Sequence, residues 1–222
     1  YVAAVRKFCA WLAQNGMKAP VFGPVEWPRH SMPPPVALSA QELDMYLRWV
    51  RANAVEPYRT AMLMAPHCGL RISELVSLKL ADVSIAGGGI ILKVLGKGNK
   101  WREVPMIDQF RPTLAKYLSG WRDDSKGSRC RSRWLFPSAT KPNIALDRRS
   151  LTQRFTEASR ALNVELTAHT MRRQYATSLH KSGVALSTIS KALGHADPRT
   201  TSERYLAMTG ADMVAATRKV KL

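Results

Sequence analysis

Helix-starting and helix-stopping residues recur at short intervals from Ser39 onward, and they divide the chain into short helices. Ser39 stands three residues before Glu42, the capping-box pattern of a helix start, and predicts a helix through about Ala52. Gly183 and Gly194 each follow a helical stretch, where glycine commonly ends a helix. The same signals predict further helices at residues 57–68, 71–78, 111–121, 150–162, from Thr167 or Thr170 to Gly183, and from Ser187 to Gly194.

Three short stretches between these helices predict strands instead. They lie around Val83, at residues 90–95 and at residues 101–105, and the glycine-flanked residues 96–100 predict a turn between the last two. We therefore expect an α+β fold that is mainly α, with a small antiparallel three-stranded sheet.

The beginning of the chain differs from the rest. Residues 1–15 predict an amphipathic helix that Gly16 ends, and the following residues, 18–35, are rich in proline and glycine, as in an extended linker. The first helix starts without a capping residue, so we expect the chain to be a piece of a longer protein. The main domain should start near Leu38.

The chain is strongly basic. Of its 222 residues, 34 are Lys or Arg and 16 are Asp or Glu, which gives a formal net charge of +18. Such like charges repel one another, and a polyanionic partner would neutralise them. Nucleic acid is the first candidate partner and an anionic membrane surface the second. No apolar run reaches the length of a membrane-spanning helix, so we expect no membrane insertion.

The cysteines indicate a reducing environment. Cys9, Cys68 and Cys130 are odd in number and far apart, with no zinc-like pair spacing. Such usage is typical of proteins that form no disulfide framework, and we expect a cytoplasmic protein.

Five scattered basic side chains and one later tyrosine form a set that suits attack on a phosphodiester. The set is Arg71, Lys97, His169, Arg172, His195 and Tyr205. Guanidinium groups bind phosphate oxygens, imidazole and ammonium groups carry protons, and a tyrosine hydroxyl is a nucleophile.

Taken singly, these residues also have ordinary structural interpretations. Arg71 could be a surface arginine at a helix end, and Lys97 a solvated turn residue. His195 could cap helix carbonyls, and Tyr205, on a helix that Asp197-Pro198 predicts, could be a core residue. The phosphodiester interpretation depends on the whole set.

His169 and Arg172 stand three residues apart, hence on one face of a helix. They could bind phosphate, or be a hydrogen-bonded histidine beside a surface arginine. The pair does not suit a metal, because it offers one nitrogen ligand beside a cation. No cluster of Asp, Glu or Cys elsewhere in the sequence compensates, so we expect neither metal nor cofactor.

Four motifs of this sequence resemble those of the tyrosine recombinases, the phage integrase family. Residues 69–75, GLRISEL, are similar to the family's first arginine box, and residues 96–105, GKGNKWREVP, to its lysine hairpin. Residues 169–177, HTMRRQYAT, resemble its second box, and the stretch 193–205, with LGH at its start and a tyrosine at its end, resembles the last. The four occur in the family's order.

The resemblance implies a role for each basic residue. Arg71 and Arg172 would hold the scissile phosphate, and His195 would donate a hydrogen bond to one of its oxygens. Lys97 would protonate the departing 5′ oxygen, and His169 would assist proton transfer from the nucleophile.

The resemblance also implies the activity, which is site-specific strand exchange on double-stranded DNA. Tyr205 would form a 3′-phosphotyrosyl link that a second 5′-hydroxyl resolves without metal or ATP. We expect Lys100, Arg102 and Arg173 to contact DNA. The sequence departs from the family in two places: Arg173 stands where histidine is common, and the interval from His195 to Tyr205 is one residue longer.

The implied domains are the last helix of a DNA-clamping domain at residues 1–16, a linker at 17–37 and the catalytic domain at 38–222. The resemblance further implies a tetrameric synapse on DNA, held by the C-terminal helix. Two alternatives remain: a topoisomerase of type IB-like chemistry, and a DNA-binding module of the same fold without catalysis.

Overall fold

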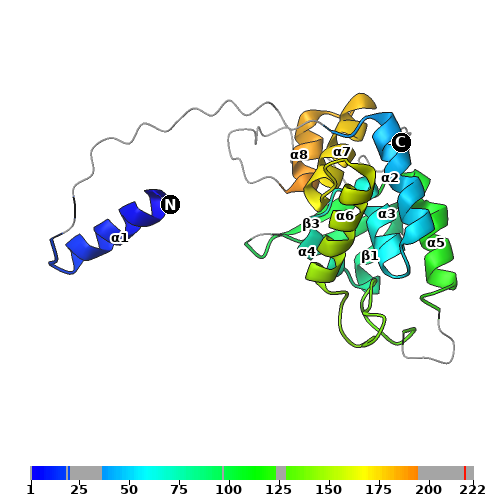
Figure 1. Ribbon diagram of the computed structural model, residues 1–222, viewed down its shortest axis with the longest axis horizontal. Helices are drawn as coiled ribbons and strands as arrows, with labels where there is room; N and C mark the ends of the chain where they lie inside the picture. Colours follow the sequence, from blue (N-terminus) through cyan, green and yellow to red (C-terminus); the bar gives the residue numbers. More distant parts are fainter. Residues whose placement is uncertain are drawn as a thin grey trace. The chain divides into compact units, whose positions relative to one another are not determined.

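The computed structural model describes residues 2–18, 20, 37–96, 98–123, 129–194 and 218 (Figure 1). The chain divides into two compact units, Tyr1–Pro35 and Val36–Leu222. In the first unit, helix α1 spans Val2–Gln14. On this helix the rings of Phe8 and Trp11 stack on each other with centroids 6.2 Å apart, and both side chains are exposed.

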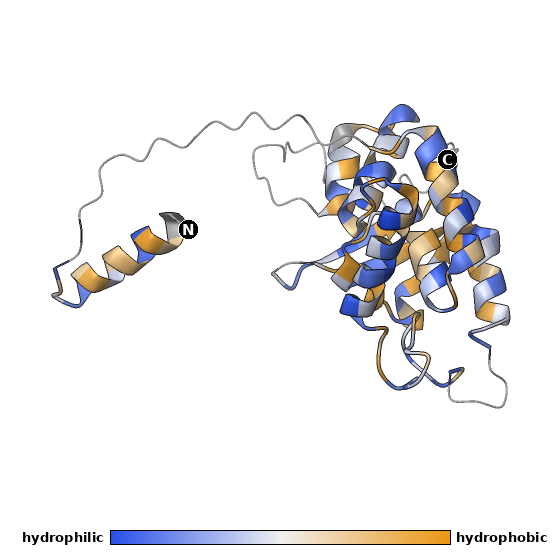
Figure 2. Cartoon of the chain, viewed as in Figure 1, coloured by the Kyte–Doolittle hydropathy of each residue, from blue (hydrophilic) through white to orange (hydrophobic). Residues whose placement is uncertain are grey.

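The second unit is assembled around α3, Tyr58–Cys68, whose residues from Thr60 to its end are all buried. Four further helices pack against α3: α2 at Ala40–Asn53, α5 at Arg111–Ser119, α6 at Arg148–Leu162 and α7 at Ala168–Lys181. Hydrophobic and hydrophilic residues alternate along these helices, as expected where one face is buried (Figure 2). Among the described residues, no helix has both the length and the hydrophobicity needed to cross a bilayer.

A three-stranded antiparallel sheet completes the unit. Strands β1, Val83–Ala86, and β3, Trp101–Pro105, flank β2, Gly89–Leu95, and the register places Leu92 opposite Val83 on one side and Val104 on the other. The α+β fold class that the sequence predicts is confirmed. Strand β1 begins at Val83, around which a strand was expected, and β2 and β3 lie within one residue of their expected bounds.

Three shorter helical segments and α8 fill the connections. They are α4 at Ile72–Val76, the 3-10 turns η1 at Leu80–Asp82 and η2 at Asp108–Phe110, and α8 at Leu186–Leu193. Helix α8 packs against both α7 and β3, and Figure 1 shows it beside β3 on the side away from α5. The site described below lies where these segments meet.

Most helix ends follow the sequence signals. Ser39 and Glu42 form the predicted capping box, and Gly69 and Gly194 end α3 and α8 in the left-handed conformation. Of the two candidates for the start of α7, Thr167 is the N-cap, because its hydroxyl accepts from the Thr170 backbone N–H at 3.0 Å.

Two helix starts were wrong. Helix α6 begins at Arg148 rather than Ser150, because the Asp147 carboxylate accepts from the Ser150 backbone N–H at 2.7 Å and is the true N-cap. Helix α8 begins at Leu186, before Ser187, and its N-cap Ala185 offers no side-chain hydrogen bond. Apart from Arg218, the predicted helix after Asp197 and the C-terminal helix lie outside the described residues.

Gly69 brings three elements into close contact. Its φ of +60° favours glycine, and a Cβ there would overlap the ring of Tyr175 on α7 and lie 3.1 Å from Leu193 Cδ2 on α8. The Tyr175 hydroxyl donates to the Pro105 carbonyl at the end of β3, at 2.7 Å. The first arginine motif is thereby held against α7, α8 and β3.

Candidate active site

Glu74 is the buried anion at the centre of the site. It lies in the first turn of α4 and its side chain is only 6% exposed. Its Oε2 accepts from the backbone N–H of the N-cap residue Arg71 at 2.8 Å, and its Oε1 accepts from Arg71 Nη1 at 2.7 Å. A glutamate at this position caps the helix and orients the arginine in one step.

A second guanidinium binds the same carboxylate from the sheet. Arg102 on β3 donates from Nη1 to Oε1 of Glu74 at 3.0 Å and from Nη2 to Oε2 at 2.8 Å. Its side chain is 11% exposed. This is the bidentate, fork-to-fork geometry that gives arginine–carboxylate pairs their strength and direction.

A third guanidinium, that of Arg172 on α7, lies next to this pair. Its Nη1 is 3.9 Å from Oε2 of Glu74 and donates to the Gly69 carbonyl at 3.0 Å. Its side chain is 8% exposed. The predicted partners Arg71 and Arg172, 101 positions apart in the chain numbering, therefore meet around Glu74.

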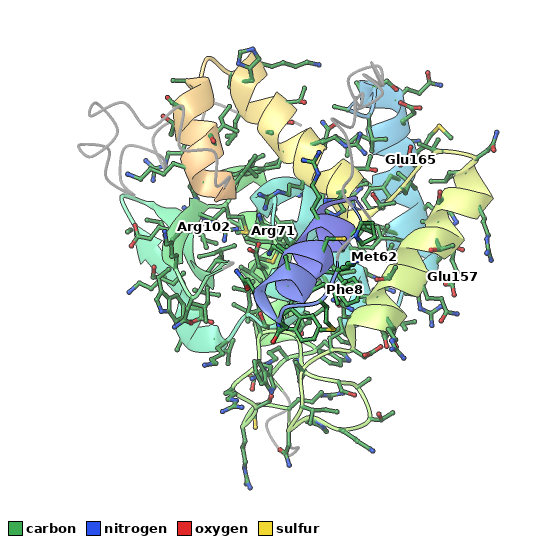
Figure 3. The ribbon with its side chains drawn as sticks, turned by 90° about the vertical axis from the view of Figure 1, so that its left-hand side faces the viewer. Phe8, Met62, Arg71, Arg102, Glu157 and Glu165 are labelled. Atoms are coloured by element: carbon green, nitrogen blue, oxygen red, sulfur yellow. The ribbon has the colours of Figure 1, made fainter. Side chains whose placement is uncertain are left out.

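The same three arginines also bind successive carbonyls at the C-terminus of α8. The Ala192 carbonyl accepts from Arg102 Nε at 2.8 Å, the Leu193 carbonyl accepts from Arg172 Nη2, and the Gly194 carbonyl lies 3.5 Å from Arg71 Nη2. These are terminal carbonyls that the helix itself cannot satisfy, and they carry the negative end of its dipole. Figure 3 shows Arg71 and Arg102 on the side where the sheet meets α8.

The cluster has more positive than negative charge. Among the described residues it joins three guanidinium groups, those of Arg71, Arg102 and Arg172, to the single carboxylate of Glu74. Burial, followed by the positive charge of Arg71, lowers the pKa of Arg172 to about 10. Burial raises the pKa of Glu74, but hydrogen bonds from Arg102 and Arg71 outweigh it and the pKa lies below its ordinary value. Such a cluster is ready to accept another anion.

The other predicted site residues fall into two groups. His169 is exposed in the first turn of α7, one turn before Arg172, while Arg173 is half-buried and Lys100 is exposed after the β2–β3 turn. Lys97, His195 and Tyr205 lie outside the described residues. Gly96 and Gly194, which directly precede the first two in the chain, are described and border the arginine cluster.

Arg102 is placed differently from its prediction. We expected it to contact DNA, but its guanidinium is turned inward, onto Glu74 and the Ala192 carbonyl. Strand alternation could have indicated this, because Arg102 stands two residues from the buried Val104 and between the exposed Trp101 and Glu103. The sequence did not identify Glu74 as the centre of three guanidinium groups.

Among the residues that the structure describes, neither the cluster nor its surroundings offers a metal site. Within the described part of the chain, no three His, Cys, Asp or Glu side chains lie close enough together to hold a metal ion. The described side chains that converge on Glu74 are all cationic, and they suit an anionic group.

The fold and the site together define a class of protein. It is a mainly helical α+β domain in which arginines surround one buried carboxylate. The phage integrase family model matches residues 38–211, and the chain belongs to this family. The resemblance seen in its four motifs is thus confirmed.

Curated relatives agree with this assignment. The chain is 31% identical to the tyrosine recombinase XerC of Rhodospirillum centenum, over 92% of this chain and 60% of that protein. It is 34% identical to the tyrosine recombinase XerD of Rickettsia prowazekii, over 90% of this chain and 68% of that protein. The chain thus spans about 60% of the length of the first of these relatives.

Solved structures share the fold. The XerA recombinase superposes with a TM-score of 0.60 at 22% identity, over 95% of this chain and 71% of that one. The XerH site-specific recombinase bound to difH substrate, in a pre-cleavage complex, gives a TM-score of 0.65 at 20% identity, over 89% of this chain and 57% of that one.

Proposed function

We propose that this chain is the catalytic part of a site-specific DNA recombinase, which cleaves and rejoins DNA strands through a 3′-phosphotyrosyl intermediate. Family membership and the names of the curated relatives, tyrosine recombinases, support it. The observation that carries the proposal is the arginine cluster, which has three guanidinium groups around one carboxylate among the described residues. One phosphodiester would balance part of this charge.

The arginines would bind the phosphate from different depths. The Arg71 side chain is 34% exposed and reaches toward solvent, whereas that of Arg172 is 8% exposed and fixed by the Gly69 and Leu193 carbonyls. Cations held in place before the substrate arrives stabilise the charge of the pentacovalent transition state without reorganisation. His195, which directly follows the α8 C-cap Gly194 in the chain, would hydrogen-bond a phosphate oxygen, the role that the family resemblance implies for it.

The bond changes balance without a metal or a cofactor. The Tyr205 oxygen forms a bond to phosphorus while the bond from phosphorus to the 5′ oxygen breaks. The tyrosine proton leaves with the help of His169, which is exposed on α7, and Lys97 donates a proton to the departing 5′ oxygen. The product keeps a phosphodiester, so attack by a second 5′-hydroxyl rejoins the strand without ATP.

Double-stranded DNA is the proposed partner, and the net charge of +18 supports it. Lys100 and Arg173 would contact the backbone near the site. We also propose that α1 belongs to a DNA-clamping domain at residues 1–16, joined by a linker at 17–37 to the catalytic domain at 38–222. The exposed Phe8 and Trp11 of α1 fit a helix that packs within a larger domain.

Two finer assignments belong to the same proposal. The chain would assemble on DNA as a tetramer through its C-terminal helix, so that two sites can exchange strands. It would act in the cytoplasm, where Cys9, Cys68 and Cys130, all free thiols, would stay reduced.

Covalent trapping tests the proposal. The chain is incubated with a library of nicked duplexes in which cleavage releases a short strand that diffuses away, so the covalent intermediate accumulates. The expected result is a denaturation-resistant adduct whose DNA is joined through its 3′ phosphate, and sequencing of that DNA gives the target.

The matched control is Tyr205→Phe, which should bind the recovered DNA and trap none. An adduct formed by this variant would refute Tyr205 as the nucleophile. DNA binding by the wild-type chain without any adduct would favour the non-catalytic module. Relaxation of supercoiled DNA of any sequence, with no strand exchange, would favour a topoisomerase.

A further inference from the structure

Arg102 connects the sheet to two other parts of the site. It starts on β3, its two Nη atoms bind both oxygens of Glu74 on α4, and its Nε donates to the Ala192 carbonyl on α8. Three elements that are distant in the sequence are thus fixed by one planar group. The contacts span 28 residues to Glu74 and 90 residues to Ala192.

Arg102 also packs against the two glycines that precede site residues. A Cβ at Gly194 would lie 3.0 Å from Arg102 Cδ and 3.1 Å from its Nε, and a Cβ at Gly96 would lie 3.0 Å from its Nη1. Gly194 is followed directly by His195, and Gly96 by Lys97. The guanidinium therefore touches the last described residue before each of these two predicted groups.

We propose that Arg102 is a positioning residue, which holds the backbone before Lys97 in register with the arginine pair around Glu74 and does not itself contact DNA. The proposal rests on the proposed function, since it assigns how the general acid is aimed. It replaces the DNA contact that the sequence suggested for Arg102.

Only an arginine can make this set of contacts. Its planar fork directs both Nη atoms to one carboxylate while Nε points to a different acceptor. A lysine at position 102 would keep the charge, but its single nitrogen cannot reach the two Glu74 oxygens and the Ala192 carbonyl together. Arg102→Lys thus removes the geometry and retains the net charge.

The test compares two leaving groups. In a nicked duplex with a 5′-bridging phosphorothiolate, the broken bond joins phosphorus to sulfur, and the thiolate leaves without a proton, because a thiol is far more acidic than an alcohol. A defect in the aim of Lys97 should therefore disappear with this substrate. A defect in phosphate binding or in the nucleophile should persist.

We expect Arg102→Lys to lose cleavage rate on the ordinary substrate and to keep most of it on the phosphorothiolate. Arg102→Lys should slow single-turnover cleavage of the ordinary substrate by about 10²-fold, the lower range for a general acid, and cleave the phosphorothiolate within a few-fold of the wild-type rate. Lys97→Ala should behave alike, whereas Arg71→Ala should be slow with both substrates. The DNA dissociation constant and its salt dependence should stay unchanged for Arg102→Lys.

Gly96→Ala is a second variant that disturbs the position of the Arg102 guanidinium and leaves Arg102 itself unchanged. Its Cβ would press on Arg102 Nη1, and it should show a smaller loss that the phosphorothiolate again rescues. It decides the matter if Arg102→Lys fails to fold.

Three results for Arg102→Lys would overturn the proposal. The first is an equal loss of cleavage rate on both substrates, and the second is no loss of rate on either. The third is weaker DNA binding with a salt slope reduced by about one, which is the sign of a lost phosphate contact. Failure of the wild-type chain to form any adduct is a separate result, because it would overturn the proposed function instead.

Discussion

Arg71 and Glu74 are joined twice, from the Arg71 backbone N–H to Oε2 at 2.8 Å and from its Nη1 to Oε1 at 2.7 Å. The carboxylate is 6% exposed and the arginine side chain 34%, so the pair runs from the interior toward solvent. One glutamate thus starts α4 and aims the guanidinium that an incoming phosphate would meet first.

This placement predicts different consequences for two arginine substitutions. Arg71→Ala should lower the rate of DNA cleavage about 10²- to 10³-fold, as expected for one lost donor to the transition state, and change the free energy of unfolding by less than about 1 kcal/mol. Arg172→Ala should lower both the rate of DNA cleavage and the free energy of unfolding. The free energy of unfolding should fall by about 1–3 kcal/mol, because the substitution removes the guanidinium that binds the buried Gly69 and Leu193 carbonyls.

Adduct formation and urea unfolding, measured on both variants, check this prediction. An Arg71→Ala chain as unstable as Arg172→Ala would contradict the exposed position of Arg71. Full cleavage activity in either variant would contradict a role in phosphate binding.

Glu74 predicts a dependence of stability on acidic pH. Its pKa in the folded protein lies below the ordinary 4.5, since the hydrogen bonds from Arg102 and Arg71 outweigh the effect of burial. As pH falls below 4.5 the unfolded chain binds the proton first, so the contribution of Glu74 is complete above this pH and is lost as pH falls through the folded pKa.

Glu74→Gln is the variant that measures this contribution. Its free energy of unfolding should be lower than that of the wild type at pH 7. Below pH 4.5 the free energy of unfolding of the variant should fall less steeply with decreasing pH than that of the wild type. The two slopes should differ by up to about 1.4 kcal/mol per pH unit. Urea unfolding between pH 3 and 7 provides the comparison, and parallel curves would show that Glu74 is not paired as described.

His67 predicts a second dependence, in a separate pH range. It is 6% exposed on α3, its Nδ1 lies 2.8 Å from the Leu63 carbonyl, and its ring centroid is 5.0 Å from that of Phe110. Burial lowers its pKa from 6.5 to about 4, and the positive charge of Arg51 acts in the same direction. Between these values the unfolded chain binds a proton that the folded chain does not.

The free energy of unfolding should therefore fall as pH is lowered from 6.5 to about 4, by up to about 3 kcal/mol in total. His67→Gln keeps a polar side chain but does not titrate, so its stability should change less over this range. The measurement is urea unfolding at half-unit pH steps. An equal slope in the variant would mean that His67 is protonated in the folded protein.

The sequence predicted local features well and distant contacts poorly, and the reason is physical. The Ser39–Glu42 capping box and the glycine end of α8 depend on neighbours within a few residues, and both were found. The start of α6 was wrong, because Asp147 and Ser150 are both good capping residues and the choice depends on which carboxylate or hydroxyl reaches a backbone N–H.

The site shows the same division. Pairing of Arg71 with Arg172 came from the family resemblance, whereas the inward orientation of Arg102 depends on contacts across 28 and 90 residues that periodicity alone does not specify. A basic residue on a short strand can point to solvent or to a buried carboxylate, and only the packing of Glu74 decides between them.

Gly69 and Gly183 form a matched pair for the last prediction. Both have positive φ, +60° and +82°, so alanine at either is strained by about 1–2 kcal/mol. A Cβ at Gly183 meets nothing within 4 Å, whereas a Cβ at Gly69 would overlap the Tyr175 ring. Gly69→Ala should therefore lower the free energy of unfolding by about 1–3 kcal/mol more than Gly183→Ala, the usual cost of overpacking.

The two variants should also differ in their rate of DNA cleavage. Relief of the overlap moves Tyr175, which lies one turn after Arg172 on α7, and a shift of that helix displaces a proposed phosphate-binding group. Gly69→Ala should thus cleave nicked DNA more slowly than Gly183→Ala under conditions where both are folded, since small misplacements at a preorganised site cost rate steeply. Equal stability and equal cleavage rates for the two variants would show that the Tyr175 ring can move aside freely, and that Gly69 does not hold the first arginine motif against α7.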